Sequence, residues 1–316
     1  MSSNDPAGQE AAGPGAIEAL LEAEGLPPSY GATIVAFWRP LAAHIAARAA
    51  AQGGPLVVGV SGSQGSGKTT LCRMLEVLLR EEHGLHAATL SLDDLYLTRA
   101  ERADLAATVH PLFATRGVPG THDVAFGTAL LAAVRAGQGA IRFPRFDKAQ
   151  DDRAPEADWQ TFAAPVDVLL FEGWCMGAHP QAEAGLVQPI NRLEAEEDAD
   201  GLWRRHVNAQ LAGPYRALFD APDVTIMLAA PSFAAVLGWR QLQEAKLRAR
   251  TGAGMSDGEV DRFVMHYERI TRNLLADLPD RADGVITLSA DHAVTGLAFA
   301  GSVSAAEPES PARLRP

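Results

Sequence analysis

The stretch VVGVSGSQGSGKTTLCRML, residues 57–75, decides the fold. It contains the pattern G-x-x-x-x-G-K-[ST] between Gly62 and Thr69, preceded by a strand-like apolar run at 56–60 and followed by a helix-like run at 69–82. In that context the pattern is typical of a phosphate-binding loop. Glycines let successive backbone N–H groups point inward, and these groups form a concave anion site together with the start of the helix. The sequence therefore predicts a loop that holds the β- and γ-phosphates of a nucleotide.

The residues of this loop have separate expected tasks. We expect the nucleotide to be bound by Gly62, Ser63, Gly65, Ser66, Gly67, Lys68, Thr69 and Thr70. Lys68 adds a positive charge beside the phosphates, and Thr69 offers its hydroxyl to Mg²⁺. Gly84 follows the helix-like run and is typical of a residue that ends a helix. A glycine-rich turn without a ligand is the alternative, but the flanks, the spacing and the lysine all disfavour it.

Composition narrows the class of protein. The chain has 316 residues, 47% of them hydrophobic and 21% charged, as expected for a soluble α/β protein. The net charge of −12 argues against general nucleic-acid binding, and the longest apolar stretch, 224–239, is too short to span a membrane. We expect a cytoplasmic protein with a small-molecule substrate and neither a nucleic-acid nor a membrane partner, whereas the oligomeric state stays open. Cys72 and Cys175 are too few for a disulfide framework, and we assign them no role.

The pattern of apolar runs predicts an α/β fold. Long helical or irregular stretches separate the strand-like runs, which are 56–60, 87–92, 166–171, 224–228 and 285–288. This pattern is typical of the three-layer fold of P-loop NTPases, with a five-stranded, largely parallel sheet and helices on both faces. We expect four segments: a disordered tail at 1–15, a helical cover at 16–52, the P-loop domain at 53–302 and a second disordered tail at 303–316.

Carboxylates follow two of the predicted strands. Asp93 and Asp94 come after the run 87–92, and Glu172 closes the run 166–171. Parallel sheets place ligands beyond the carboxyl ends of their strands, so these side chains should lie beside the phosphate loop. A carboxylate there can orient an alcohol and accept its proton, whereas a nucleotide switch must position water instead. Neighbouring strand residues point to opposite faces, so we expect only one aspartate to face the loop. Glu172 is expected to reach the metal ion or its water shell.

Four other segments carry charged residues. RGVPGTHD (116–123) and FPRFDKAQDDRAP (143–155) suit loops that clamp a polar substrate, or plain surface connections. The acidic run 194–200 is most simply a solvated loop or helix edge. A capping box at Ser256 begins a predicted helix whose polar face includes Arg269, which faces either solvent or the site.

Several of these motifs together resemble one family. GSQGSGKTT, SLDDLYLT, RGVPGTHD, PRFDK, FEGW and MSDGEVDRFVMHYERIT occur in the order seen in the D-glycerate 3-kinase family, over roughly residues 56–275. That family belongs with the uridine kinase, pantothenate kinase and phosphoribulokinase group of P-loop kinases. The resemblance implies a kinase that uses ATP and Mg²⁺ to convert D-glycerate to 3-phosphoglycerate.

The resemblance also implies roles for individual residues. It places the catalytic base at Asp93 and the metal-binding residues at Thr69 and Glu172. It implies a helical lid over the phosphates at 238–250, where Arg240 is the first candidate for charge stabilisation, ahead of Lys246 and Arg248. We expect the acceptor to be bound by Asp93, Tyr96, Arg116, His122, Asp123, Lys148 and Arg153.

One departure leaves the acceptor open. Plant-type members of the family carry a longer, glycine-containing insert where this chain has the short segment DKAQDDR, 147–153. A uridine or pantothenate-like alcohol is therefore the alternative acceptor, and uridine would favour an aromatic stacking platform. Candidates for such a platform lie near the motifs, namely Tyr96, Phe113, Phe143 and Phe146. A nucleotide switch is less favoured, because the chain lacks the Asn-Lys-x-Asp tetrapeptide of guanine-specific GTPases.

Overall fold

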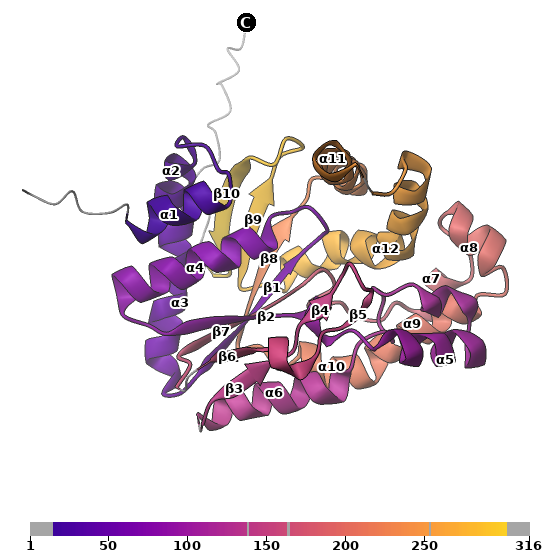
Figure 1. The fold of residues 1–316 in the computed structure, drawn as a ribbon, viewed down its shortest axis with the longest axis horizontal. Coiled ribbons are helices and arrows are strands. Elements are labelled where there is room, and N and C mark those ends of the chain that lie inside the picture. Colours follow the sequence, from indigo (N-terminus) through magenta and orange to yellow (C-terminus); the bar gives the residue numbers. More distant parts are fainter. Residues whose placement is uncertain (1–14, 138, 163–164, 253, 302–316) are drawn as a thin grey trace, which may run out of the picture.

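A mostly parallel sheet forms the centre of the molecule, as a computed structural model of residues 15–301 shows, with 138, 163–164 and 253 not described (Figure 1). Within the described residues this sheet has six strands, in the order β10-β9-β8-β1-β7-β2. Their bounds are β1 (Leu56–Gly62), β2 (Ala87–Ser91), β7 (Val168–Gly173), β8 (Val224–Ala229), β9 (Gly284–Leu288) and β10 (Val294–Phe299). The five predicted strands are confirmed and run parallel, whereas the antiparallel edge strand β10 was missed. The predicted terminal tails, apart from Gly15 itself, lie outside the described residues.

Helices cover both faces of this sheet, as predicted (Figure 1). On one face lie α3 (Arg39–Gln52), α4 (Lys68–His83) and α11 (Phe233–Thr251), and on the other α6 (Val124–Ala136), α9 (Leu202–Ala212) and α10 (Pro214–Phe219). The long helix α12 (Asp257–Asp277) contributes to both cores. The side chains of β1 alternate accordingly, with Val57 in one core and Val58 in the other.

Shorter elements fill the connections. These are α1 (Ala16–Ala23), α2 (Tyr30–Thr33), a π-helical turn (Ile34–Trp38), α5 (Arg99–Thr108), α7 (Glu183–Leu186) and α8 (Arg192–Glu197). Two small antiparallel pairs are β3 (Ile141–Phe143) with β6 (Gln160–Phe162), and β4 (Phe146–Asp147) with β5 (Asp152–Arg153). The 3-10 turns are Leu92–Leu95, Pro111–Ala114, Glu156–Asp158 and Leu278–Asp280. None of the described helices combines the length and apolar character needed to cross a membrane.

The helix boundaries follow the predicted signals. Gly84 ends α4 in a left-handed conformation with φ +65°, and its N–H donates to the carbonyl of Arg80. Ser256 and Glu259 form the predicted capping box at the start of α12. These ends could be read from the sequence because the signals involve only neighbouring residues.

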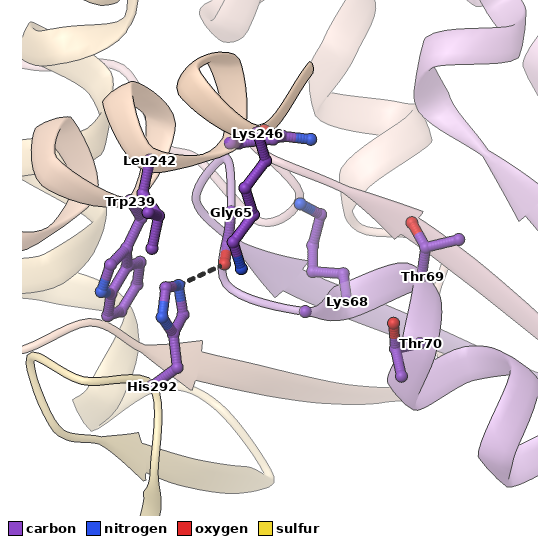
Figure 2. A pocket seen from close by; sticks show the side chains of 10 residues that line it. Gly65, Lys68, Thr69, Thr70, Trp239, Leu242, Lys246 and His292 are labelled. Carbon is purple, nitrogen blue, oxygen red and sulfur yellow. Dashed lines mark hydrogen bonds between the residues drawn. The ribbon is translucent and has the colours of Figure 1, made fainter. Parts of the chain in front are cut away.

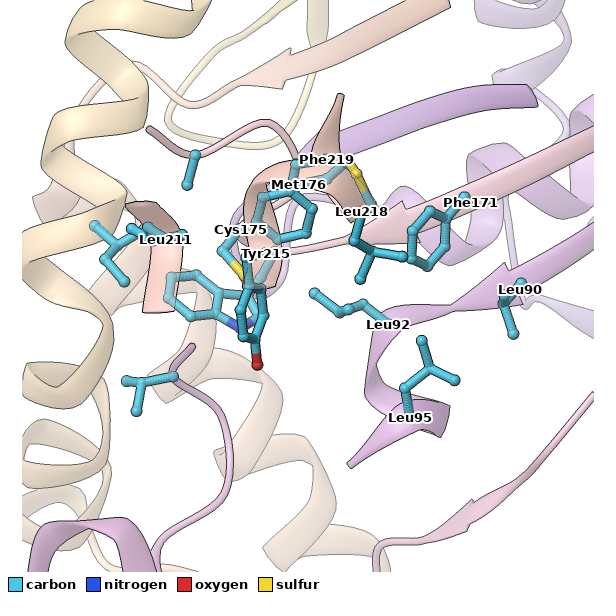
Figure 3. Close-up of a cluster of buried hydrophobic side chains, with 14 of the residues drawn as sticks. Leu90, Leu92, Leu95, Phe171, Cys175, Met176, Leu211, Tyr215, Leu218 and Phe219 are labelled. Carbon is cyan, nitrogen blue, oxygen red and sulfur yellow. The ribbon is translucent and has the colours of Figure 1, made fainter. Parts of the chain in front are cut away.

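One hydrophobic core fixes the turn that carries the two aspartates. Leu92 and Leu95 flank Asp93 and Asp94 and are fully buried. Figure 3 shows them with Phe171 of β7 and Leu218 of α10 in the same cluster. A methyl group at Gly173 would lie 2.8 Å from Leu92, so the chain approaches this turn closely. The aspartates therefore stand on a turn anchored by apolar packing on both sides.

The two cysteines are buried in opposite cores. Cys175 belongs to the cluster of Figure 3 and Cys72 to the core under α4, and neither forms a disulfide. Burial raises the pKa of both thiols well above the ordinary value.

The acidic run at 194–200 differs from its prediction. Glu194 and Asp198 are buried rather than solvated: α8 packs against α12 at Glu194, and the start of α9 binds Asp198. Glu194 forms an ion pair of 2.6 Å with Arg269, and Asp198 forms one of 2.9 Å with Arg204. The prediction for this run was wrong for these two acids, and Arg269 faces neither solvent nor the site.

This burial leads to a stability test. Arg269→Gln should lower the free energy of unfolding by about 3–5 kcal/mol, because it leaves the Glu194 carboxylate buried without its partner. Arg262 on the same helix forms an exposed ion pair with Glu197, and Arg262→Gln should cost at most about 1 kcal/mol. Denaturant titration of both variants measures the difference. Equal losses would contradict the buried arrangement.

Candidate active site

The phosphate loop connects β1 to α4 and is shaped for an anion. Gly65 and Gly67 have φ of +76° and +88°, values that favour glycine. A methyl group at Gly62 would lie 2.7 Å from the Ser66 hydroxyl. The first N–H groups of α4 have no partner inside the helix, and the buried hydroxyls of Ser63 and Ser66 have none within the described residues. The loop thus presents unused donors around a concavity, which fits the expected phosphates.

A cavity of about 330 Å³ opens beside this loop (Figure 2). Its lining residues are Gly65, Gly67, Lys68, Thr69 and Thr70 of the loop, Trp239, Leu242, Gln243 and Lys246 of α11, and His292. Lys68 Nζ donates to the Ser63 carbonyl at 3.2 Å, so the ammonium curls over the loop. Five of the eight predicted nucleotide-binding residues therefore face an open space of molecular size, whereas Gly62, Ser63 and Ser66 are not part of its lining.

His292 and Trp239 form the far wall of this cavity, and the sequence did not indicate them. The His292 ring stacks on Trp239 with 4.3 Å between centroids, and Nε2 lies 2.9 Å from the Gly65 carbonyl oxygen. His292 has φ +67°, a conformation that non-glycine residues rarely adopt. It stands in the turn between β9 and β10, where no motif or periodicity marks it.

The predicted lid helix is α11. Of its three cations, Lys246 lines the cavity, whereas Arg240 pairs with Glu244 at 2.6 Å and Arg248 pairs with Asp257 at 2.7 Å. The Arg240 guanidinium also lies over the Phe263 ring, 5.6 Å from its centroid. In this conformation Lys246 is thus placed toward the phosphate loop more directly than Arg240.

The predicted metal-binding residues lie together at the carboxyl ends of the strands. Glu172 Oε1 lies 3.5 Å from the Thr69 hydroxyl and accepts a hydrogen bond of 2.9 Å from the Ser91 hydroxyl. Among the described residues, no group of three or more His, Cys, Asp or Glu side chains is arranged to hold a metal ion by itself. Oxygen ligands of this kind suit a Mg²⁺ ion that takes its other ligands from phosphates and water.

The two aspartates lie on the 3-10 turn rather than on the strand, so the alternation argument does not apply to them. Hydrogen bonds distinguish them instead. Asp93 accepts from the Tyr96 hydroxyl at 3.0 Å and from Lys148 Nζ at 2.7 Å. Asp94 accepts from the backbone N–H of Phe146 at 2.9 Å. Both line the same cavity, but the hydrogen bonds to the Asp93 carboxylate come from side chains, whereas the one to Asp94 comes from the main chain of β4.

Their environments separate their pKa values. Burial by itself raises the pKa of Asp93, but the ammonium groups of Lys148 and Lys68 outweigh it and hold this pKa below its ordinary value. Burial raises the pKa of Asp94 to about 6, although the N–H of Phe146 and the charge of Arg145 oppose the shift. Asp94 consequently adds to stability at acid pH, and this contribution falls as the pH rises toward 6. Of the two aspartates, Asp93 therefore ionises at the lower pH, because two ammonium groups lie close to it.

A cavity of about 690 Å³ joins these groups, and we call it the acceptor cavity. It is lined by Thr69, Arg73, Glu76, Thr89, Ser91, Asp93, Asp94, Arg145, Phe146, Asp147, Lys148, Ala149, Gln160, Phe162 and Glu172. The structure therefore brings the predicted base, the predicted metal-binding residues and Lys148 to one space. Arg73, Glu76 and Arg145 were not singled out in the sequence, although Arg145 stands within the motif PRFDK.

The other predicted acceptor residues, Tyr96, Arg116, His122, Asp123 and Arg153, are not part of the lining of this cavity. Arg116 forms an ion pair with Asp151. Arg153 donates to the Tyr96 carbonyl at 3.2 Å and pairs with Asp123 at 3.4 Å. These arginines connect the β4–β5 hairpin to the surrounding chain.

Buried side chains also hold the motif 116–123 in place. The His122 ring stacks on Tyr96 with 4.5 Å between centroids, and its Nδ1 lies 2.7 Å from the Tyr215 hydroxyl. Burial lowers the pKa of His122 to about 3, so this imidazole is neutral. Asp123 caps α6 by accepting from the N–H of Phe126 at 3.0 Å. Tyr96 thus donates to Asp93 while its ring packs against both His122 and Phe146 of the β4–β5 hairpin.

Comparison with known proteins identifies relatives along most of this chain. The kinase mug58 of Schizosaccharomyces pombe, described as uncharacterized, is 37% identical over 227 residues, which are 68% of this chain and 79% of that protein. The chloroplastic D-glycerate 3-kinase of Arabidopsis thaliana is 34% identical over 67% of this chain and 46% of the plant protein. The solved D-glycerate 3-kinase of Cryptococcus neoformans superposes with a TM-score of 0.71 and 26% identity, over 84% of this chain and 99% of that one. No family model matches the sequence.

The loop geometry leads to a binding test. Lys68→Ala should weaken ATP binding by about ten- to one hundredfold, because it removes a charged donor to the phosphates. The fold should persist, since Lys68 lines the cavity rather than either core. Calorimetric titration with ATP and Mg²⁺ measures the affinity, and Arg80→Ala, on an exposed part of α4, is the matched control. Unchanged affinity in Lys68→Ala would remove the assignment of this loop.

Proposed function

The chain belongs to the D-glycerate 3-kinase family of P-loop kinases, and from this premise we propose that it transfers the terminal phosphoryl group of ATP to D-glycerate, giving 3-phosphoglycerate. The observation that carries the proposal is the acceptor cavity. It places the ionised Asp93 in the same space as Thr69 and Glu172, at the phosphate end of the loop. A carboxylate in this position can act on an alcohol that approaches the phosphate.

The proposed reaction is a direct in-line transfer. The acceptor hydroxyl gives its proton to Asp93 while its oxygen forms the new bond to phosphorus and the bond to the leaving ADP oxygen breaks. Each oxygen of Asp93 keeps a second lone pair beside its hydrogen bond from Tyr96 or Lys148, so it can still receive the acceptor. Mg²⁺, when bound by Thr69 and Glu172, would supply positive charge to the phosphate oxygens.

Cationic groups of the loop and lid complete the proposed mechanism. Lys68 and the N–H groups of the loop stabilise the charge that develops on the phosphates. Arg240 would join them only after leaving Glu244, whereas Lys246 already lines the cavity. The lid role assigned to Arg240 therefore requires a movement of its side chain, and Lys246 needs none.

The acceptor residues support a hydroxy acid rather than a nucleoside. Tyr96, Phe113 and Phe143 are buried, and the Phe146 ring is covered by Arg116 at 5.3 Å and by the edge of Tyr96. These rings are thus not free to stack on a base. Lys148 contacts Asp93 and can bind an acceptor carboxylate from the same hairpin, while Arg116 and Arg153 would act by holding that hairpin.

A panel of acceptors tests the proposed function. With ATP and Mg²⁺, D-glycerate should give a higher kcat/KM than L-glycerate, uridine or pantothenate. A higher value for uridine or pantothenate would overturn the proposed acceptor. ATP turnover that is independent of every acceptor would overturn the kinase itself.

The two aspartates give a second test. Asp93→Asn should lower the rate of transfer by roughly 10²–10⁴, the usual contribution of general acid–base catalysis, with little change in ATP affinity. Asp94→Asn should be milder, because the amide oxygen can still accept the N–H of Phe146. Single-turnover phosphorylation beside ATP titration measures both effects. Loss of transfer in Asp94→Asn alone would assign the base to the other aspartate.

A further inference from the structure

Most cations of the acceptor cavity are already paired. Three basic side chains line it: Arg73, Arg145 and Lys148. Arg73 forms an ion pair with Glu24, directly after α1, and Lys148 forms one with Asp93. The guanidinium of Arg145, by contrast, makes no hydrogen bond or ion pair within the part of the chain that the structure describes. It is a positive charge in the cavity wall that is available to a ligand.

The main chain at Arg145 is fixed although its side chain is exposed. The Arg145 carbonyl accepts from the N–H of Ala154 at 2.8 Å, across the β4–β5 hairpin. The next residue, Phe146, is buried, and its N–H donates to Asp94 at 2.9 Å. The main chain that carries the Arg145 side chain is thus held by hydrogen bonds on both sides. A preorganised donor loses less freedom on binding than one carried by a mobile loop.

Buried charges anchor the hairpin to the body of the protein. Asp151 forms ion pairs with Arg102 and Arg116, and the side chain of Arg102 is only 1% exposed. Asp152 accepts from the N–H of Arg99, at the start of α5. Arg116, which the sequence suggested as an acceptor residue, therefore holds the segment that presents Arg145.

The charge of the cavity explains why a free guanidinium matters there. Its lining includes five carboxylates, namely Glu76, Asp93, Asp94, Asp147 and Glu172. These carboxylates repel an anionic acceptor that approaches Asp93, unless a cation of the cavity binds the acceptor. A guanidinium offers parallel N–H groups that match both oxygens of a carboxylate, which an ammonium cannot do.

We propose that Arg145 binds the carboxylate of the acceptor and thereby restricts the enzyme to hydroxy acids. This inference rests on the proposed function, because it takes the acceptor cavity as the place where the hydroxyl is phosphorylated. Asp94 then has a positioning role, since its bond to Phe146 fixes the strand next to Arg145. Lys148 remains the partner of Asp93 until the acceptor enters.

Steady-state kinetics of one variant tests the inference. Arg145→Gln should raise KM for D-glycerate by about ten- to one hundredfold, the loss expected for a charged hydrogen bond to a carboxylate. KM for ATP should stay unchanged, and the preference for D-glycerate over glycerol should fall by a similar factor. Arg145→Lys should recover part of the loss, because lysine restores the positive charge but not the parallel N–H groups of the guanidinium. The matched control is Arg142→Gln, on the exposed face of β3 beside Glu156, which should behave as wild type.

Three outcomes would overturn the inference. They are an unchanged KM for D-glycerate in Arg145→Gln, an equal loss of activity with D-glycerate and glycerol, and an equal rise in KM for ATP. Failure of the proposed function looks different, because the wild-type enzyme itself would then not use D-glycerate. In that event the measurements are repeated with the acceptor that the wild type prefers, and an acceptor without an anionic group would overturn the inference as well.

Discussion

The ion pair between Asp93 and Lys148 is the contact on which the candidate site depends. Asp93 lies on the 3-10 turn that follows β2, whereas Lys148 belongs to the small β4–β5 hairpin. Their 2.7 Å contact closes the hairpin onto the strand ends and holds the pKa of the carboxyl below its ordinary value. Burial raises the pKa of this carboxyl, and the neighbouring ammonium groups oppose that shift where an alcohol and a phosphate are proposed to meet.

Apolar packing holds the turn that carries the aspartates, and ion pairs hold the β4–β5 hairpin. Leu92 and Leu95 fix the turn of the aspartates from the core, so its position does not depend on polar contacts alone. Arg102 and Arg116 fix the hairpin through Asp151. Two segments far apart in the sequence thus meet at a set distance before any ligand is bound. Such preorganisation is what positioning and electrostatic catalysis of phosphoryl transfer require.

Local signals could be read from the sequence, and long-range packing could not. The phosphate loop, the five parallel strands and the caps at Gly84 and Ser256 involve residues close together in the chain, and the structure confirms them. The edge strand β10 was missed because its pattern is only partly buried. The buried pair of Arg269 and Glu194 depends on the packing of α8 against α12, which no periodicity reveals. Likewise, whether a given arginine is paired depends on its neighbours in space. Arg116 and Arg145 both stand in quoted motifs, yet Arg116 pairs with Asp151 and Arg145 forms no ion pair within the described residues.

The central claim is that the phosphoryl group passes to an alcohol and not to water. Phosphorus NMR of the wild-type enzyme with ATP, Mg²⁺ and D-glycerate observes this choice directly. The account predicts one phosphate monoester formed for each ADP, with no inorganic phosphate beyond the level of the control without enzyme. Inorganic phosphate that accumulates in step with ADP, with or without D-glycerate, would contradict it.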